Sequence, residues 1–199
     1  RPLTVFVAGI LSPGPVIGST QMISVKDAYD ISLIGVGNDA TITNVGLNIN
    51  RAKNVIVRNI TFASCPDDGI AVEADDNETL GHHIWIDHCT FTDVPPPGYP
   101  AGSTPDGALD VTHTAAYVTI SWCKFTQHDK TCLMGHSDSQ ASDVALKVTY
   151  HHDYFDSTTQ RHPRVRWHGR TDAPFEPPQT RQPRTAGQVH LAHPQLHHL

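Results

Sequence analysis

At 199 residues, with 38% hydrophobic and only 17% charged residues, the chain is long enough for a continuous core and too apolar to be disordered. A net charge of −6 argues against a general polyanion binder but is compatible with a local basic site, and no apolar run is long enough to cross a bilayer. We expect one folded domain that acts as a monomer and binds neither nucleic acid nor membranes.

The N-terminal part of the chain contains short apolar runs that are separated by turns rich in Gly and Pro. The runs are residues 3–7, 22–25, 31–36 and 40–42, and each has the length and composition of a strand. We expect them to form the first coils of the fold. The N-terminal coil is expected to lie open, because no capping segment is apparent before Arg1.

Further along the chain a nine-residue pattern occurs four times. Each copy closes on a phenylalanine, and successive phenylalanines are 29, 34 and 30 residues apart, an interval typical of solenoid repeats. The second and fourth residues of a copy are apolar, as in a half-buried strand, but the next inward residues are the seventh and ninth, so the chain must bend between them. Only Asp153 breaks this pattern. The copies are residues 54–62, 83–91, 117–125 and 147–155.

A bent pair of strands that recurs about every 30 residues, without helical periodicity between the copies, predicts an all-β parallel β-helix rather than a sandwich. In such a solenoid each rung lies ~4.8 Å above the last, so equivalent residues form ladders. The longest interval contains residues 94–105, which are rich in Pro and Gly and are expected to form a surface loop.

The four cysteines lack the C-x-x-C spacing of zinc or redox sites. Cys89 and Cys123 occupy the same inward position of successive copies, which favours buried free thiols that fill the core as small apolar residues do. A disulfide between these two is the alternative. The other two are Cys65 and Cys132.

Three aspartates stand at the starts of successive rungs. Asp68 follows Phe62 by six residues, and Asp106 and Asp110 are four residues apart on the next rung, hence on one side of an extended segment. Stacked carboxylates repel and raise one another's pKa. A cation with oxygen ligands relieves this repulsion, and an open carboxylate site with room for water and substrate suits Ca²⁺ better than Mg²⁺. The alternative is that these aspartates only begin turns.

A basic group follows, formed by Lys130, Arg161, Arg164 and Arg166. Arg161 stands six residues after the last phenylalanine of the repeat, the same offset as the first aspartate, so the ladder places it on the face that carries the carboxylates. A guanidinium group binds a carboxylate through two hydrogen bonds, and a lysine supplies a point charge. These cations either neutralise the aspartates or bind an anionic polymer with a carboxylate on each unit.

Several motifs occur in order between about residues 42 and 169: WIDHCTF, DGALDV, YVTISWCKF with HDK and GHSDS, VTYHHDYF, and RHPRVR. Together they resemble the pectate lyases of polysaccharide lyase family one. The resemblance implies a right-handed parallel β-helix that cleaves α-1,4-linked polygalacturonate by calcium-dependent β-elimination and gives unsaturated oligogalacturonides. It also implies a secreted, extracellular enzyme.

Carried over motif by motif, the resemblance makes Asp68, Asp106 and Asp110 the calcium ligands. It makes Arg161 the Brønsted base that removes the C5 proton. Lys130 and Arg166 would bind the substrate carboxylate, and Arg164 would support the strand. Other motif residues are interpreted as structural or as supports of the site: Asp87, His88, His136 and Ser137.

The repeat pattern stops near residue 169, whereas family members usually continue with further coils. Residues 1–169 are therefore expected to be the β-helix catalytic domain, truncated at one or both ends. Residues 170–199 are interpreted as an irregular tail, rich in Pro, His and Arg, that need not belong to the fold. Two alternatives stay open: a non-catalytic polyuronate-binding or inactive truncated fragment, and a galacturonan hydrolase on the same fold. A pectin lyase is disfavoured because its site replaces the calcium carboxylates with a cation.

Overall fold

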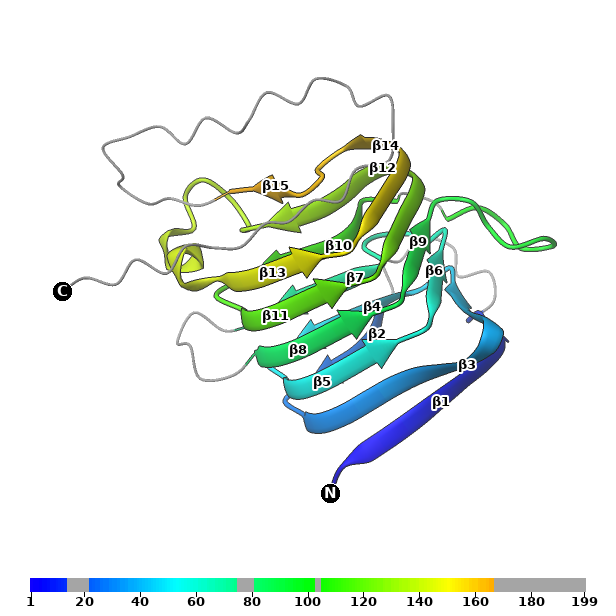
Figure 1. The fold of residues 1–199 in the computed structure, drawn as a ribbon, viewed down its shortest axis with the longest axis horizontal. Helices are drawn as coiled ribbons and strands as arrows, with labels where there is room; N and C mark the ends of the chain where they lie inside the picture. Colours follow the sequence, from blue (N-terminus) through cyan, green and yellow to red (C-terminus); the bar gives the residue numbers. More distant parts are fainter. Residues whose placement is uncertain (14–21, 75–80, 103–104, 167–199) are drawn as a thin grey trace.

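The computed structural model describes residues 1–13, 22–74, 81–102 and 105–166 of the chain. These residues wind into a column of parallel strands, each paired with its equivalent in the neighbouring coil (Figure 1). The all-β parallel β-helix predicted from the repeat is confirmed.

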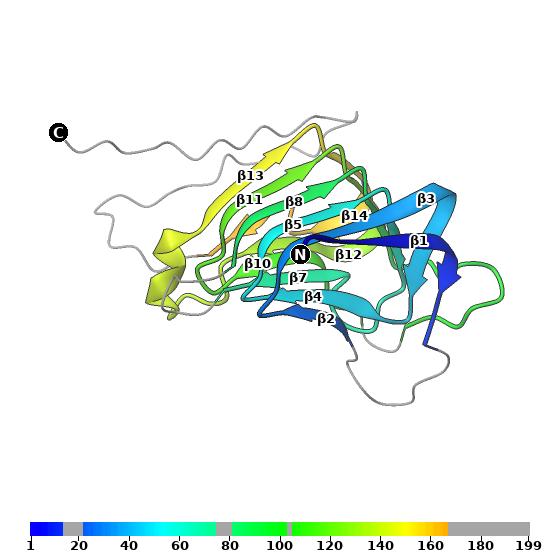
Figure 2. The ribbon, with the colours of Figure 1, turned by 90° about the horizontal axis from the view of Figure 1, so that it is seen from below.

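The column has three faces, and one coil contributes a strand to each. The first face contains β5 (Lys53–Arg58), β8 (His82–Asp87), β11 (Ala116–Ser121), β13 (Lys147–His151) and the first half of β3 (Tyr29–Thr43). The second face contains the rest of β3, β6 (Thr61–Ala63), β9 (Thr90–Thr92), the first half of β12 (Lys124–Met134) and the first half of β14 (Tyr154–Gln160), whose second half pairs with β12 beyond the corner. The third face, called the site face below, contains β2 (Met22–Lys26), β4 (Gly46–Asn50), β7 (Ile70–Glu73), β10 (Gly107–Thr112), the rest of β12 and β15 (Arg164–Val165). Figure 2 shows the first face and the site face on opposite sides of the core.

Equivalent residues of the nine-residue copies stack inside the column, as the ladder predicts. Val57 is in register with Ile86, and Ile86 with Ile120. The four closing phenylalanines form a column of nearly parallel rings whose centroids lie 5.4, 5.0 and 4.8 Å apart. Stacking of this kind adds about 0.5–1.5 kcal/mol per pair to the free energy of burial. These core contacts fix the vertical register of segments that are far apart in the sequence.

The predicted bend in each copy is made by one residue in the left-handed conformation. The sixth residue of every copy has a φ between 51° and 58°, a region that residues other than glycine rarely occupy. At Asn59 the side-chain amide donates hydrogen bonds to the carbonyl oxygens of Gly35 and Gly37, at 2.9 and 2.8 Å. The corner residues are Asn59, His88, Trp122 and His152.

All four cysteines are buried and free, which confirms the expectation for Cys89 and Cys123. In the last copy the same inward position holds Asp153, which is only 2% exposed. Its Oδ1 accepts a hydrogen bond from the Cys123 amide at 2.7 Å. Burial raises the pKa of Asp153 to about 7, although backbone amides act in the opposite direction.

Two strands are longer than the sequence pattern predicts. Residues 31–36 and 40–42 belong to the single strand β3, and β12 extends beyond the third nine-residue copy, through residues 126–134, onto the site face. Left-handed residues, Gly37 in β3 and Gln127 in β12, turn the chain while the pairing with neighbouring coils continues on both sides of the corner. Residues 94–102 form turns without a strand, as expected for the loop. The predicted tail, residues 170–199, lies outside the described residues.

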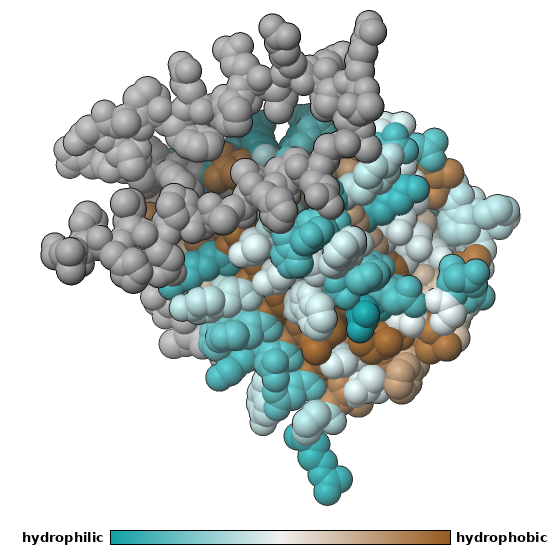
Figure 3. Space-filling view, viewed as in Figure 1, coloured by the Kyte–Doolittle hydropathy of each residue, from teal (hydrophilic) through white to brown (hydrophobic). Residues whose placement is uncertain are grey.

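At the N-terminal end of the column, β1 (Leu3–Leu11) pairs with β3 and with no other described strand. Its apolar side chains are exposed, Leu3 by 53% and Phe6 by 67%, and Figure 3 shows apolar side chains among polar ones over β1 and β3. Within the described ranges, no helix is long and apolar enough to cross a membrane.

Candidate active site

The predicted site residues gather on the site face and at the turns that lead into it. Asp67 and Asp68 precede β7, Asp106 precedes β10, and Asp110 lies within β10. Because β7, β10 and the second half of β12 are consecutive strands of this face, residues from three coils lie side by side. The remaining predicted residues come from β12 and from the segment around β15: Lys130, Arg161, Arg164 and Arg166.

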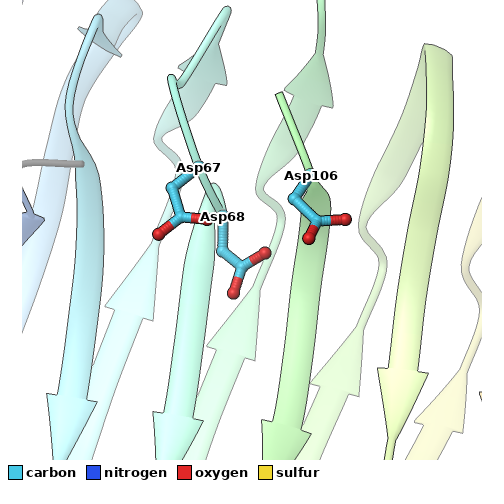
Figure 4. A group of neighbouring side chains, drawn as sticks. All are labelled: Asp67, Asp68 and Asp106. Atoms are coloured by element: carbon cyan, nitrogen blue, oxygen red, sulfur yellow. The ribbon is translucent and has the colours of Figure 1, made fainter. Parts of the chain in front are cut away.

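Three carboxylates form a compact group. Oxygen atoms of Asp67, Asp68 and Asp106 lie within 4.8 Å of one another, and Figure 4 shows how two neighbouring coils present them. The Asp106 amide donates to the Asp67 carbonyl oxygen at 3.1 Å, which joins the two segments. Asp67 was not among the residues predicted from the sequence. The signal that could have identified it is its position next to Asp68 in the DDG segment.

Gly107 leaves room for the carboxylates of Asp68 and Asp110. A Cβ atom at this position would lie 2.5 Å from the Asp110 Oδ1 and 2.7 Å from the Asp68 Oδ1, so any side chain would displace a carboxylate. The Gly107 amide also donates to the Asp68 Oδ1 at 2.7 Å. Asp110 itself is 8% exposed and accepts a hydrogen bond from the Leu133 amide at 3.0 Å. Asp110 is a neighbour of the compact group but is not one of the three residues whose oxygen atoms lie within 4.8 Å of one another.

Two of the predicted cations contact this acidic site directly. Lys130 Nζ donates to Asp106 Oδ1 at 2.8 Å. The Arg161 Nη1 lies 3.3 Å from Asp110 Oδ2, and its Nη2 lies 3.7 Å from Asp106 Oδ1. The expectation that the ladder places Arg161 on the face of the carboxylates is confirmed. The predicted roles of these residues remain predictions.

The other two arginines lie further along the same face. Arg164 is exposed and is in register with Leu133 on β12. Arg166 Nε lies 3.8 Å from Asp138 Oδ1, and in the described part of the chain Arg166 makes no ion pair with the acidic site. Its backbone passes so close to Gly135 that a Cβ there would lie 1.7 Å from the Arg166 carbonyl oxygen.

Burial and mutual repulsion raise the pKa values of the acidic residues. Burial raises the pKa of Asp68 to about 7 against the opposing effect of the Gly107 amide, and the charges of Asp67 and Asp106 add to the rise. For Asp110, burial and then the charge of Asp68 raise the pKa to about 8, although Arg161 opposes the change. Burial and the Asp106 charge also raise the pKa of Asp67. The carboxylates are thus poorly compensated by the protein alone.

The donor set suits a hard divalent cation. All the ligand atoms are carboxylate oxygens, the donors that Ca²⁺ and Mg²⁺ prefer, and their separation would allow several of them to bind one ion. The side chain of Asp106 is 45% exposed, so a bound ion would be accessible to solvent and to a substrate. Asp67, Asp68, Asp106 and Asp110 are the residues that would hold it.

The motif residues outside this site have structural contacts. Asp87 is 2% exposed, accepts a hydrogen bond from Ser121 Oγ at 2.7 Å and pairs with Arg58 at 3.1 Å. His88 Nδ1 lies 2.7 Å from Asp87 Oδ2 and forms a corner of the coil. These contacts support the structural interpretation of Asp87 and His88. A groove lined by Arg58, Trp85, Asp87, His88 and Trp122, among others, lies on the first face.

The fold and the site define a parallel β-helix protein with an acidic site and adjoining cations on one outer face. A family model described as pectate lyase matches residues 19–172. The chain therefore belongs to the pectate lyase family.

Similar proteins carry the same description. The pectate trisaccharide-lyase of Thermotoga sp. (strain RQ2) is 42% identical over 156 residues, a match that covers 72% of this chain and 38% of the relative. Pectate lyase E of Dickeya chrysanthemi is 40% identical over 157 residues, and this match covers 68% of this chain and 40% of the relative. A crystal structure of a pectate lyase from Bacillus sp. N165 in complex with trigalacturonate superposes with a TM-score of 0.69 at 32% identity and covers 83% of this chain and 52% of that one. The chain thus spans about half, or less, of the length of these relatives.

Proposed function

We propose that this chain carries the active site of a calcium-dependent pectate lyase, which cleaves α-1,4-linked polygalacturonate by β-elimination and releases unsaturated oligogalacturonides. The observation that carries the proposal is the Arg161 guanidinium group, 3.3 Å from Asp110 and 3.7 Å from Asp106 at the edge of a carboxylate group suited to a divalent cation. The trigalacturonate in the related Bacillus structure supports the substrate class.

We assign calcium to the carboxylates, with Asp68, Asp106 and Asp110 as ligands and Asp67 as a neighbouring donor. Calcium is preferred to magnesium because an open site fed by several carboxylates accommodates its larger and less regular coordination shell. When bound, the ion would withdraw charge from the carboxylate of the substrate and acidify the neighbouring C5–H bond.

Arg161 is the proposed base. Arg161 in its neutral guanidine form takes the proton from C5 and becomes the guanidinium cation, the electron pair of the C–H bond forms the C4–C5 double bond, and the C4–oxygen bond breaks. The departing glycosidic oxygen takes a proton from water. The side chain of Arg161 is 16% exposed, so it is held against the site rather than spread over the surface.

Lys130 and Arg166 are the proposed contacts for substrate carboxylates, and Arg164 supports the strand that holds Arg166. Lys130 is 36% exposed and already bonds to Asp106, so its charge lies at the edge of the acidic site. A polymer with a carboxylate on each unit meets cations at both positions, and the cations stabilise the negative charge that develops during proton removal.

Arg161→Ala provides the direct test. Activity is followed as the ultraviolet absorbance of unsaturated product on polygalacturonate, with calcium and with a chelator. We expect chelator-sensitive activity that Arg161→Ala abolishes while calcium binding, measured by calorimetry, is retained. Arg51→Ala is the matched control because it removes an arginine whose ion pair, with Asp27, is exposed and distant from the acidic site.

The alternatives give different results in the same assay. Chelator-insensitive cleavage that leaves saturated ends would identify a galacturonan hydrolase. Binding of oligogalacturonate without new absorbance would identify a non-catalytic fragment. Retained turnover in Arg161→Ala would remove Arg161 from the proposed role.

We also propose that the protein acts outside the cell, as a monomer. A long polysaccharide does not cross membranes, so an enzyme that cleaves it must be exported to reach it.

A further inference from the structure

Thr131 is a buried residue of β12 that lies beneath the backbone of Arg161. It follows Lys130 in the sequence and is fully shielded from solvent. Its hydroxyl lies within hydrogen-bond distance of two successive carbonyl oxygens, that of Gln160 at 2.9 Å and that of Arg161. A hydroxyl has a single hydrogen to donate, so this hydrogen is shared between the two. The amide of the next residue, Cys132, donates to the same Arg161 carbonyl at 2.8 Å.

These contacts act at a corner where the conformation of the backbone decides where the arginine points. β14 ends at Gln160 and β15 begins at Arg164, and Arg161 has a φ of 63°. A residue with a side chain occupies this left-handed region only when its surroundings hold it there. In the extended conformation that Arg161 would otherwise favour, its side chain would leave the site face in another direction.

We propose that Thr131 is a positioning residue for Arg161. Its hydroxyl, together with the Cys132 amide, holds the left-handed corner from which the guanidinium group reaches Asp110 and Asp106. This inference rests on the proposed function, in which Arg161 acts on the substrate. Thr131 does not touch the substrate, because its side chain is buried inside the column. It acts through its hydrogen bond to the backbone of Arg161.

The hydroxyl can be separated from the volume of the side chain. Thr131→Val keeps the shape and removes the donor, and Thr131→Ser keeps the donor and removes a methyl group. The loss of the donor leaves the Gln160 carbonyl without this partner and frees the corner, and a displacement of about 1 Å at a reacting group can cost roughly a hundredfold in rate. We expect Thr131→Val to lower kcat on polygalacturonate by about 10- to 100-fold, with KM and calcium affinity within about twofold of the parent. Thr131→Ser should restore most of kcat.

Thr43 provides a matched control. It is also fully buried, on β3, and its hydroxyl donates to the Ala63 carbonyl oxygen at 2.8 Å, with no contact to the acidic site. Thr43→Val should lower thermal stability to a similar extent as Thr131→Val and leave kcat unchanged. The comparison is made on the full chain at a temperature at which both variants are folded by circular dichroism. If Thr131→Val does not fold, Thr131→Cys replaces it, because the thiol is a weaker donor and should give an intermediate loss of kcat.

The outcomes separate this inference from the proposed function. A loss of turnover in Arg161→Ala together with unchanged kcat in Thr131→Val would overturn the positioning role alone. So would a Thr131→Ser variant as slow as Thr131→Val. Retained turnover in Arg161→Ala would overturn the role of Arg161 and this inference with it. A loss of kcat in Thr131→Val that Thr131→Ser restores and that Thr43→Val does not share supports the inference.

Discussion

At the scale of single residues, the carboxylates around Arg161 differ in their surroundings. Asp67, Asp68 and Asp106 share the compact oxygen group, whereas Asp110 is buried and, like Asp68, has a carboxylate oxygen close to Gly107. Charges that are held away from water interact more strongly than exposed ones. Asp68 and Asp110, whose pKa values are raised to about 7 and about 8, should therefore depend most on a bound cation.

Asparagine substitutions test this order. We expect Asp68→Asn and Asp110→Asn each to weaken calcium binding by about 10- to 100-fold, because each removes the charge of a proposed ligand. Asp67→Asn should weaken it by less than about threefold, because Asp67 is only a neighbouring donor. Calorimetric titration with calcium measures all three. The control is Asp30→Asn, since Asp30 bonds only to the exposed side chain of Asn54 among the hydrogen bonds described. A larger loss of calcium affinity in Asp67→Asn than in Asp110→Asn would mean that the ion is bound by Asp67, Asp68 and Asp106 rather than by Asp110.

Asp153 makes a separate prediction about pH. Because burial raises its pKa to about 7 from an ordinary value of 3.8, the folded state binds a proton that the unfolded state releases. The stabilisation is complete below the unfolded pKa and is lost as the pH rises through the folded pKa. Asp153→Asn keeps an oxygen acceptor for the Cys123 amide and carries no charge. Its free energy of unfolding should exceed that of the parent by an amount that grows by about 2–3 kcal/mol between about pH 5 and pH 8. Urea unfolding of both proteins at the two pH values measures this, and a difference independent of pH would show that Asp153 titrates normally.

At the scale of elements, the sequence predicts the coils well because the apolar positions within each copy of the repeat show which side chains are buried. The alternation of residues 54–62 identifies the two strand segments of this copy and the bend between them. The structure places the corner at Asn59, within that bend. The continuity of β3 and β12 was not predicted. Pairing with neighbouring coils carries these strands around a corner, and that contribution is absent from the local pattern.

The site was predictable as far as the ladder determines it. Equal offsets from Phe62 and Phe155 placed Asp68 and Arg161 on one face, and the ion pairs of Arg161 agree with that placement. Asp67 was missed because an adjacent residue in a strand would point to the opposite side, whereas the segment before β7 is a turn. The support from Thr131 was also missed, since it depends on which carbonyl oxygens a buried hydroxyl reaches.

At the scale of the whole molecule, the acidic site joins neighbouring coils of a column whose stability depends on contacts between neighbours. Asp68 precedes β7 and Asp106 precedes β10, and the stacked phenylalanines transmit the same register through the core. A cation held by both segments would add a link between coils in the folded state only. Calcium should therefore stabilise the fold as well as serve the reaction.

A ligand that binds only the folded state adds about 2.7 kcal/mol at a hundred times its dissociation constant. For a chain of this size that corresponds to a rise in the unfolding temperature of about 5–10 °C. We expect this rise with calcium, a smaller one with magnesium at equal concentration, and about half of it or less in Asp68→Asn, because the carboxylate that links the two segments is lost and calcium binds about 10- to 100-fold more weakly. Differential scanning calorimetry of the parent, Asp68→Asn and the Asp30→Asn control measures the effect without any substrate. Equal shifts in the parent and in Asp68→Asn would mean that the ion stabilises the column from another place, and the acidic site would then no longer account for calcium binding.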